Sequence, residues 1–385
     1  MEMLIRDICT DITDGSHNPP KGIDSGEFMM LSSKNVFDGR ITFDEPRYLT
    51  EADFINEDKR TQIEVGDVLM TIVGTVGRVA VVDESMQKFT LQRSVAVLRP
   101  KNEICSSKYL MYALQAKRNE IERKAKGVAQ KGIYLKEVGN LDVNVLDRTM
   151  QDVVVSGLDR VAAILIARQQ QLQKLDELVK ARFAELFGDP ISNPHGFEKV
   201  DLSELADIKI GPFGSLLHKE DYIEGGYALL NPSHIIDGKI APDSKLTVSR
   251  EKYEELSVYH LKAGDVVMGR RGEMGRCAVV PCDGYLCGTG SLLIRTKGDV
   301  TADYIQKIIS FPSFKKTIED MAVGQTMPNL NVPIVSRFQI IKPPIEVQHS
   351  YYAFVEQVDK SKVAVQKALD EAQLLFDSLM QKYFE

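Results

Sequence analysis

Arginines in two glycine-rich turns are the residues whose type and spacing best fit a binding chemistry. One turn, GRRGEMGR, contains Arg270, Arg271 and Arg276, and a second turn, GTVGR, contains Arg78. Glycine lets a backbone approach a phosphate closely, and the arginine fork can pair with two acceptors of guanine. These turns predict contacts with phosphates or base edges, although basic side chains on a surface are often only solvated.

Signatures of catalysis are weak in this sequence. The residues 18–21, NPPK, are similar to the (D/N)PP(Y/F) motif of adenine methyltransferases, but Lys21 stands where an aromatic side chain would stack on a flipped base. We interpret them as a turn, and we interpret Asp67 and Asp265, which precede matching strands, in the same way. Cys277, Cys282 and Cys287 lack the close pairs of a zinc site, and no GxxxxGK(S/T) loop occurs. The sequence predicts no catalytic residue and no metal.

Length and composition indicate two globular domains. The chain has 385 residues, 43% of them hydrophobic, which is long for a single core. A net charge of -7 argues against a simple basic nucleic-acid binder, but the charge of one face decides binding. Five scattered cysteines indicate reduced thiols, and no apolar run is long enough for a membrane span. We expect a cytoplasmic protein with no membrane contact.

The chain contains one unit written twice. VGDVLMTIVGTVGRVAVV at 65–82 matches AGDVVMGRRGEMGRCAVV at 263–280, an offset of 264 − 66 = 198. Upstream, VFDGRI at 36–41 parallels IIDGKI at 235–240. The matches continue downstream in unbroken order, pairing Arg99 with Arg295, Tyr109 with Tyr304, Gln130 with Gln325, and Leu175 with Leu369. Collinear similarity of this length indicates a duplicated unit.

Each unit ends in a long helix with apolar residues in strict 3-4 alternation. This spacing is typical of a coiled-coil seam, whereas a packed core helix usually shows a wider apolar face. The predicted seam consists of Leu158, Val161, Leu165, Leu172, Leu175, Val179 and Leu186 in the first helix, and of Phe354, Val358, Val365, Ala368, Ala372, Leu375 and Leu379 in the second. We expect these two helices to pair with each other.

These observations predict an α+β fold with a pseudo-twofold internal repeat. Two similar globular domains occupy 1–148 and 188–346, each with short strands and a mixed helical patch. Two long helices, at 149–187 and 347–385, join them as an antiparallel coiled coil. FGDP at 187–190 ends the first helix.

The order of motifs resembles the specificity (S) subunits of type I restriction–modification systems. The resemblance rests on DGSHNPPKG (14–22), LQRSVAVLRP (91–100), IGPFGSLLHKEDY (210–222) and the exit loops GVAQKGIY (127–134) and AVGQTMPNL (322–330), in addition to the repeated turns. It covers nearly the whole chain.

This resemblance implies a non-catalytic protein with two target-recognition domains. Each domain reads one half of a split target in double-stranded DNA, and the paired helices fix the distance between the halves. The helices also dock two methyltransferase (M) subunits, and restriction/translocase (R) subunits join that core. No cofactor belongs to this chain, because S-adenosylmethionine and ATP with Mg²⁺ are expected on the partner subunits.

Turn positions and family motifs together suggest the DNA-contacting residues. In the first domain they are His17, Lys21, Lys34, Asn35, Thr75, Arg78, Arg93, Gln130 and Lys131, and in the second they are Ser215, His218, Asn231, His234, Arg270, Arg271, Arg276, Gln325 and Thr326. Arg78 and Arg276 occupy the same place in both units, so we expect them to position the DNA. Arg270 and Arg271 replace Ile72 and Val73, so we expect them to specify bases.

One alternative from another functional class stays open. A coiled-coil scaffold or adaptor with two ligand-binding heads would have the same architecture. Such an adaptor does not require glycine-rich turns with arginines on both heads. A stand-alone nuclease or methyltransferase is disfavoured by the missing motifs.

Overall fold

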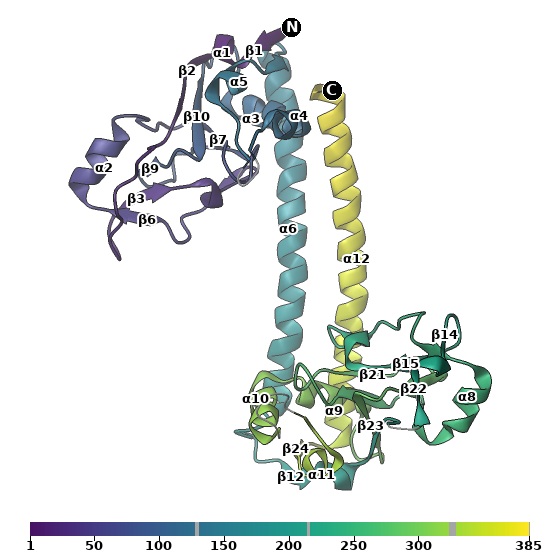
Figure 1. Ribbon diagram of the computed structural model, residues 1–385. Coiled ribbons are helices and arrows are strands. Elements are labelled where there is room, and N and C mark those ends of the chain that lie inside the picture. The colour runs from purple at the N-terminus through teal and green to yellow at the C-terminus, as the bar shows by residue number, and fades with distance from the viewer. Residues whose placement is uncertain (128–130, 214–215, 323–328, 385) are drawn as a thin grey trace. The chain divides into compact units, whose positions relative to one another are not determined.

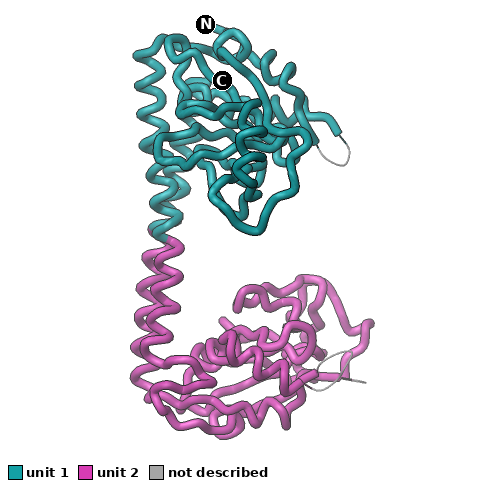
Figure 2. The backbone as a smooth tube through the Cα atoms, turned by 90° about the vertical axis from the view of Figure 1, so that its left-hand side faces the viewer, with its two compact units in different colours: residues 1–171, 365–385 teal, residues 172–364 magenta. Residues whose placement is uncertain are grey.

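The computed structural model describes residues 1–127, 131–213, 216–322 and 329–384. The chain divides into two compact units, coloured separately in Figure 2. Unit 1 contains Met1–Gln171 and Val365–Glu385, and unit 2 contains Leu172–Ala364. The long helices α6 (Arg148–Phe187) and α12 (Ile345–Phe384) each contribute residues to both units.

Unit 1 is built on an antiparallel sheet of strand order β2-β10-β7-β8 and a second sheet of order β6-β3-β9, in which β3 and β9 are parallel. Ahead of α6 its elements are β1 (Glu2–Leu4), α1 (Ile5–Ile8), β2 (Cys9–Asp14), β3 (Phe28–Leu31), η1 (Ser33–Asn35), β4 (Val36–Phe37), β5 (Arg40–Ile41), β6 (Arg47–Leu49), α2 (Glu51–Asp58), β7 (Val68–Thr71), β8 (Val79–Val81), β9 (Phe89–Leu91), β10 (Val95–Pro100), α3 (Ser107–Ala116), α4 (Arg118–Lys124), α5 (Leu135–Gly139) and β11 (Asp142–Asn144).

Strand β7 is buried on both faces, which explains its uninterrupted apolar sequence. Val68 and Met70 pack in one cluster with Tyr109 of α3. Leu69, which points the other way, packs in a second cluster with Leu31 of the neighbouring sheet. Successive side chains of a strand alternate between its faces, so α3 and the second sheet cover opposite faces of the central sheet.

Unit 2 repeats this plan, with sheets of order β13-β23-β20-β21 and β14-β18-β15-β22-β19. Between the long helices its elements are β12 (Glu198–Asp201), α7 (Leu202–Leu205), β13 (Ala206–Ile210), η3 (Lys219–Asp221), β14 (Tyr222–Ile223), β15 (Tyr227–Leu230), η4 (Pro232–His234), β16 (Ile235–Ile236), β17 (Lys239–Ile240), β18 (Thr247–Val248), α8 (Arg250–Glu255), η5 (Ser257–Tyr259), β19 (His260–Leu261), β20 (Val266–Gly269), β21 (Cys277–Val279), β22 (Tyr285–Cys287), β23 (Ser291–Thr296), α9 (Ala302–Ile309), α10 (Pro312–Met321), α11 (Val332–Ser336) and β24 (Gln339–Lys342).

The repeat extends to individual hydrogen bonds. In unit 1 the buried side chain of Gln151 on α6 accepts from the backbone NH of Ser106 at 2.9 Å. In unit 2 the buried side chain of Gln348 on α12 accepts from the backbone NH of Thr301 at the same distance. Ser106 and Thr301 are the N-caps of α3 and α9. Each long helix is therefore attached to its globular part by the same contact, and the predicted duplication is confirmed.

The two long helices run in opposite directions where they meet inside each unit (Figure 1). In unit 1 the end of α12 reaches the beginning of α6, and Phe376 and Phe384 contact Tyr112 and Tyr109 of α3. In unit 2 the end of α6 reaches the beginning of α12, where the ring of Phe183 lies 5.5 Å from that of Tyr351. These contacts confirm the antiparallel pairing. Among the described residues, no helix combines the length and apolar character of a membrane span.

The buried stripe follows the predicted seam with one departure. Leu158, Val161, Val358 and Val365 are buried. The remaining predicted seam residues are half-buried, apart from Leu375: they are Leu165, Leu172, Leu175, Val179, Leu186, Phe354, Ala368, Ala372 and Leu379. Leu375 is 51% exposed, and the ring of Phe376 contacts Tyr112 instead. Adjacent helical residues point about 100° apart, so only one of the two can face the unit 1 core.

Candidate functional site

The glycine-rich turn of unit 1 is held against the exit loop by backbone hydrogen bonds. Gly74 donates to the carbonyl of Lys131 at 2.9 Å, and Ile133 donates to the carbonyl of Ile72 at 2.9 Å. Gly74 adopts a φ of 84°, which favours glycine at this point of the turn. The predicted residues Thr75 and Lys131, both exposed, are thereby brought to the same edge of the unit.

The N-terminal loop approaches the same edge through a close backbone contact. Ser16 donates to the carbonyl of Leu91 at 2.7 Å, and Arg93 donates to the carbonyl of Ser16 at 2.9 Å. A Cβ at Gly15 would lie 2.1 Å from the Leu91 oxygen, so a side chain cannot be accommodated at this position. This contact brings the predicted residues His17 and Arg93 together.

These segments enclose a cleft of about 650 Å³ in unit 1, which we call the basic cleft. It is lined by Asp14, His17, Arg60, Ile72, Val73, Arg93, Lys126, Gly127, Gly132, Ile133, Tyr134 and Leu135. Of the predicted DNA-contacting residues it contains His17 and Arg93. Arg60, Lys126 and Tyr134 also line the cleft and are not among the residues predicted from the sequence. No motif marks Arg60, whereas Tyr134 closes the quoted exit loop and is 73% exposed.

Asp14 organises one wall of the basic cleft. Its side chain is only 9% exposed and lies 2.5 Å from Nη2 of Arg60. The Arg60 Nε donates to the backbone oxygen of Asp14 at 2.8 Å, so the guanidinium is held at two points. The Nε2 of His17 lies 2.9 Å from the other carboxylate oxygen. A buried carboxylate with these partners fixes the loop and the arginine relative to each other.

In unit 2 the glycine-rich turn meets its exit loop in the same way. Leu330 donates to the carbonyl of Arg270 at 2.9 Å, and Nε of Arg270 donates to Oδ1 of Asn329 at 3.0 Å. Burial and the neighbouring charge of Arg271 lower the pKa of Arg270. Two adjacent guanidinium groups repel each other, and a nearby anion would relieve that repulsion. Arg271 is exposed.

The two arginines shared by the repeats are engaged within their own units. The guanidinium of Arg78 lies 4.9 Å from the centre of the Phe37 ring. Nη2 of Arg276 lies 2.5 Å from the carboxylate of Glu273. Arg276 and Lys315 together lower the pKa of the Glu273 carboxyl. Arg276 also lines a pocket of about 400 Å³ in unit 2. These contacts favour a role in positioning over base reading.

Asn35 and His234, both predicted to contact DNA, lie at matching places and have buried side chains. The Asn35 amide donates to the carbonyl of Asp44 at 2.9 Å. Nδ1 of His234 lies 2.8 Å from the carbonyl oxygen of Leu229. Both side chains hold the short 3₁₀ turns η1 and η4 to the adjoining chain. Polar turn residues can serve either fold or ligand, and in this structure the polar atoms of these two bond within their own unit.

The other predicted residues are spread over the two units. Lys21, Lys34 and His218 are exposed, and Lys34 lies 3.7 Å from a carboxylate oxygen of Glu45. Asn231 is half-buried beside His234. The remaining predicted residues, Gln130, Ser215, Gln325 and Thr326, lie outside the described residues.

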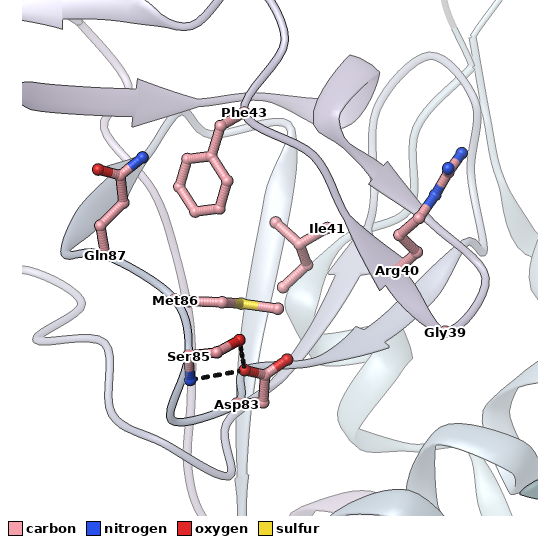
Figure 3. Close-up of a pocket in the computed structure, with 8 residues that line it drawn as sticks. All are labelled: Gly39, Arg40, Ile41, Phe43, Asp83, Ser85, Met86 and Gln87. Atoms are coloured by element: carbon pink, nitrogen blue, oxygen red, sulfur yellow. Dashed lines mark hydrogen bonds between the residues drawn. The ribbon is translucent and has the colours of Figure 1, made fainter.

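A separate pocket of about 490 Å³ in unit 1 contains none of the predicted contact residues (Figure 3). Ile41, Phe43 and Met86 contribute apolar side chains to it. Oδ1 of Asp83 accepts from the Ser85 backbone NH at 2.8 Å and from its hydroxyl. These bonds lower the pKa of Asp83 and hold its carboxylate within the turn at 83–85. This arrangement offers no acid–base pair.

The three cysteines of unit 2 differ in their exposure to solvent. Cys277 and Cys287 are buried, and Cys282 is exposed. Burial raises the pKa of both buried thiols to about 12. Within the described ranges, no three His, Cys, Asp or Glu side chains come together in a way that could hold a metal ion.

The sequence matches a known protein family. The family model for the type I restriction modification DNA specificity domain matches residues 23–177 and again 194–372. The type I restriction enzyme EcoBI specificity subunit of Escherichia coli is 23% identical over 204 residues, which are 51% of this chain and 41% of that protein. The chain therefore matches less than half the length of that relative.

Two solved structures resemble the whole chain in fold. The type I restriction–modification S subunit from M. genitalium is 14% identical with a TM-score of 0.59, covering 100% of this chain and 96% of that one. A structure described as the basis of complex assembly and conformational transition of the type I R-M system is 16% identical with a TM-score of 0.62, covering 100% and 97%.

Proposed function

The chain belongs to the type I restriction–modification DNA specificity family, and from this premise we propose that it is the non-catalytic specificity subunit of such a complex. In this proposal each unit reads one half of a bipartite target in double-stranded DNA, through recognition domains at 1–148 and 188–346. The observation that carries it is the repeated edge at which a glycine-rich turn with an arginine is hydrogen-bonded to an exit loop.

Two methyltransferase subunits would dock on the long helices. Apolar side chains remain exposed along these helices, and a docked subunit would cover them. They are Val153, Ile164, Ile166, Leu178, Val363 and Leu374. Restriction/translocase subunits would join that core.

Cofactors in this proposal belong to the partners. S-adenosylmethionine would be held by the methyltransferase subunits, and ATP with Mg²⁺ by the restriction/translocase subunits. The charge of this chain is consistent with partner subunits that contribute to DNA binding. Its net charge of -7 provides little general attraction for DNA, so basic partners would supply much of the clamp.

The length of the long helices would set the gap between the two half-sites. Helices α6 and α12 have 40 residues each, which corresponds to about 60 Å of helix. One turn of DNA measures about 34–36 Å, so the helix length is comparable with fewer than two turns. Bases in the gap would be ignored.

The test is to co-express this chain with the methyltransferase encoded beside it and to map methylated adenines in the host DNA. We expect one split motif with a fixed gap. Removing one heptad from each long helix preserves the seam and shortens the helices by about 10 Å. The gap should then shrink by about three base pairs.

A matched control removes four residues from each long helix instead. This deletion rotates the seam and should abolish assembly. If the proteins associate but no methylation appears, the scaffold interpretation is favoured. An unchanged gap after the heptad deletion would show that the helices do not set the spacing.

A further inference from the structure

The basic cleft concentrates positive charge in a chain that is acidic as a whole. Arg60, Arg93 and Lys126 line it, and Asp14 is the acidic residue among its lining side chains. Counting these three cations against Asp14 leaves two positive charges in excess. The cleft is thus locally positive, although the chain as a whole carries a net charge of -7. The chemistry of the cleft therefore fits an anionic ligand.

Two of the three cations have no partner of their own within the described part of the chain. The side chains of Arg93 and Lys126 make no ion pair there, whereas Arg60 is held by Asp14. Arg93 and Lys126 come from separate segments, the turn between β9 and β10 and the residue just before the exit loop. Both segments are positioned by backbone hydrogen bonds, Arg93 to Ser16 and Lys126 to Gly132. The backbone positions of both cations are thus fixed by hydrogen bonds within unit 1.

The pairing of Asp14 with Arg60 is particular to unit 1. Gly15 and Gly211 occupy equivalent places, because a Cβ at either one would lie about 2 Å from a backbone oxygen of the facing strand end. The residue before Gly15 is Asp14, and the residue before Gly211 is Ile210. Unit 2 thus has an apolar side chain where unit 1 holds Arg60 through a carboxylate.

We propose that the basic cleft binds the sugar–phosphate backbone of the DNA half-site read by unit 1, with Arg93 and Lys126 as phosphate contacts. This rests on the proposed function and adds the site and the residues. Arg60, fixed by Asp14, forms a third positive group on the cleft wall, and the exposed Tyr134 also lines the cleft. Phosphate contacts of this kind fix the register of a protein on DNA.

The experiment uses the full complex of this chain with its methyltransferase and a duplex carrying the mapped motif. Binding is measured from 50 to 200 mM salt for the wild type and for R93A/K126A. Loss of two phosphate contacts should lower the slope of log K against log salt by roughly 2, because each contact contributes about 0.9. Across this salt range the variant should lose roughly tenfold less affinity than the wild type loses.

A second measurement locates the contacts. Single methylphosphonate substitutions, which remove the charge of one phosphate, are scanned across both half-sites. The wild type should be weakened at positions in both halves. R93A/K126A should become insensitive at positions of one half and stay sensitive in the other, because neutralising a phosphate costs nothing once its protein partner is gone.

A charge-matched control is K88A/K101A, which removes two positive charges of unit 1 outside the basic cleft. It should keep the full pattern of sensitive phosphates. Thermal unfolding and copurification with the methyltransferase verify that each variant folds. If the double variant does not fold, R93A and K126A are measured singly, each with an expected slope change of roughly 1.

The outcomes separate the two proposals. If the wild-type complex binds its motif specifically but R93A/K126A keeps the wild-type salt slope and phosphate pattern, the cleft is not the contact site and the proposed function stands. If the wild-type complex shows no preference for any motif, the proposed function fails and the cleft assignment fails with it.

Discussion

Asp67 and Arg99 form a two-point ion pair at the start of β7. Nε and Nη2 of Arg99 each lie 2.8 Å from a different carboxylate oxygen of Asp67. In unit 2, Arg295 holds Asp265 at 2.7 and 2.6 Å. Each aspartate also accepts from a backbone NH three residues earlier, as the turn interpretation predicts. The repeated GD sequence thus anchors a turn and joins it to the neighbouring strand.

Replacing Arg99 by alanine should destabilise unit 1 by about 3 kcal/mol, because it leaves the buried Asp67 carboxylate without its counterion. We place the cost at the low end of the usual range because the Arg99 side chain is still 27% exposed. Hydrogen exchange of peptides from β7 and β10 measures the effect, since it reports the opening of one unit.

The control for this prediction is the same substitution in unit 2. R295A should accelerate exchange in β20 and β23 and leave β7 and β10 unchanged, and R99A should do the reverse. Equal effects of either variant on both units would show that the pair does not stabilise its own unit locally. Little effect from either would mean that the ion pair contributes no net stability.

The architecture was accessible from the sequence because the duplication supplies an internal comparison. Segments such as VLM and VVM, which lack alternation, are buried on both faces of a sheet, and the helical seam follows a simple period. The particular contacts were less accessible. Arg60 reaches Asp14 across 46 positions, and no local pattern marks that pair. Asn35 and His234 have residue types suited to DNA but fold inward, because short turns need internal hydrogen-bond partners.

The seam offers a test that uses two adjacent residues. F376A should destabilise unit 1 by about 2 kcal/mol, because the Phe376 ring packs against Tyr112 and is only half-buried. L375A should change stability by less than about 0.5 kcal/mol, since its side chain is 51% exposed. Exchange of peptides from α3 and the end of α12 distinguishes them. If L375A were more destabilising than F376A, Leu375 would face the core as the strict 3-4 seam predicts.

One of the five cysteines should react with thiol reagents in the folded chain, and the other four should not. Burial raises the pKa of Cys9, Cys105, Cys277 and Cys287 to about 12, so at pH 8 these thiols stay protonated and unreactive. Cys282 is exposed. Iodoacetamide at pH 8 should label Cys282 alone in the folded chain, and all five cysteines in denaturant, as counted by peptide mass spectrometry.

The same thiols should contribute a pH dependence of stability. Their folded pKa values lie above the unfolded value of 9.0, so the folded state retains protons that the unfolded state loses. The contribution of these protonated thiols to the free energy of unfolding is therefore fully present below pH 9 and is lost as the pH rises toward 12. C277A/C287A should unfold at alkaline pH with a shallower dependence than the wild type. An identical dependence would contradict the assigned burial.

Arg271 provides the sharpest test of base reading in unit 2. It is exposed in the glycine-rich turn, it replaces an apolar residue of unit 1, and its backbone pairs with that of Asn329 in the exit loop. R271A should lose about 1–3 kcal/mol of discrimination at one base position of one half-site. R276A, whose guanidinium is already paired with Glu273, should weaken binding without relaxing any base position. Methylation maps of both variants would reveal the difference, and a motif left unchanged at every position by R271A would remove Arg271 from base recognition.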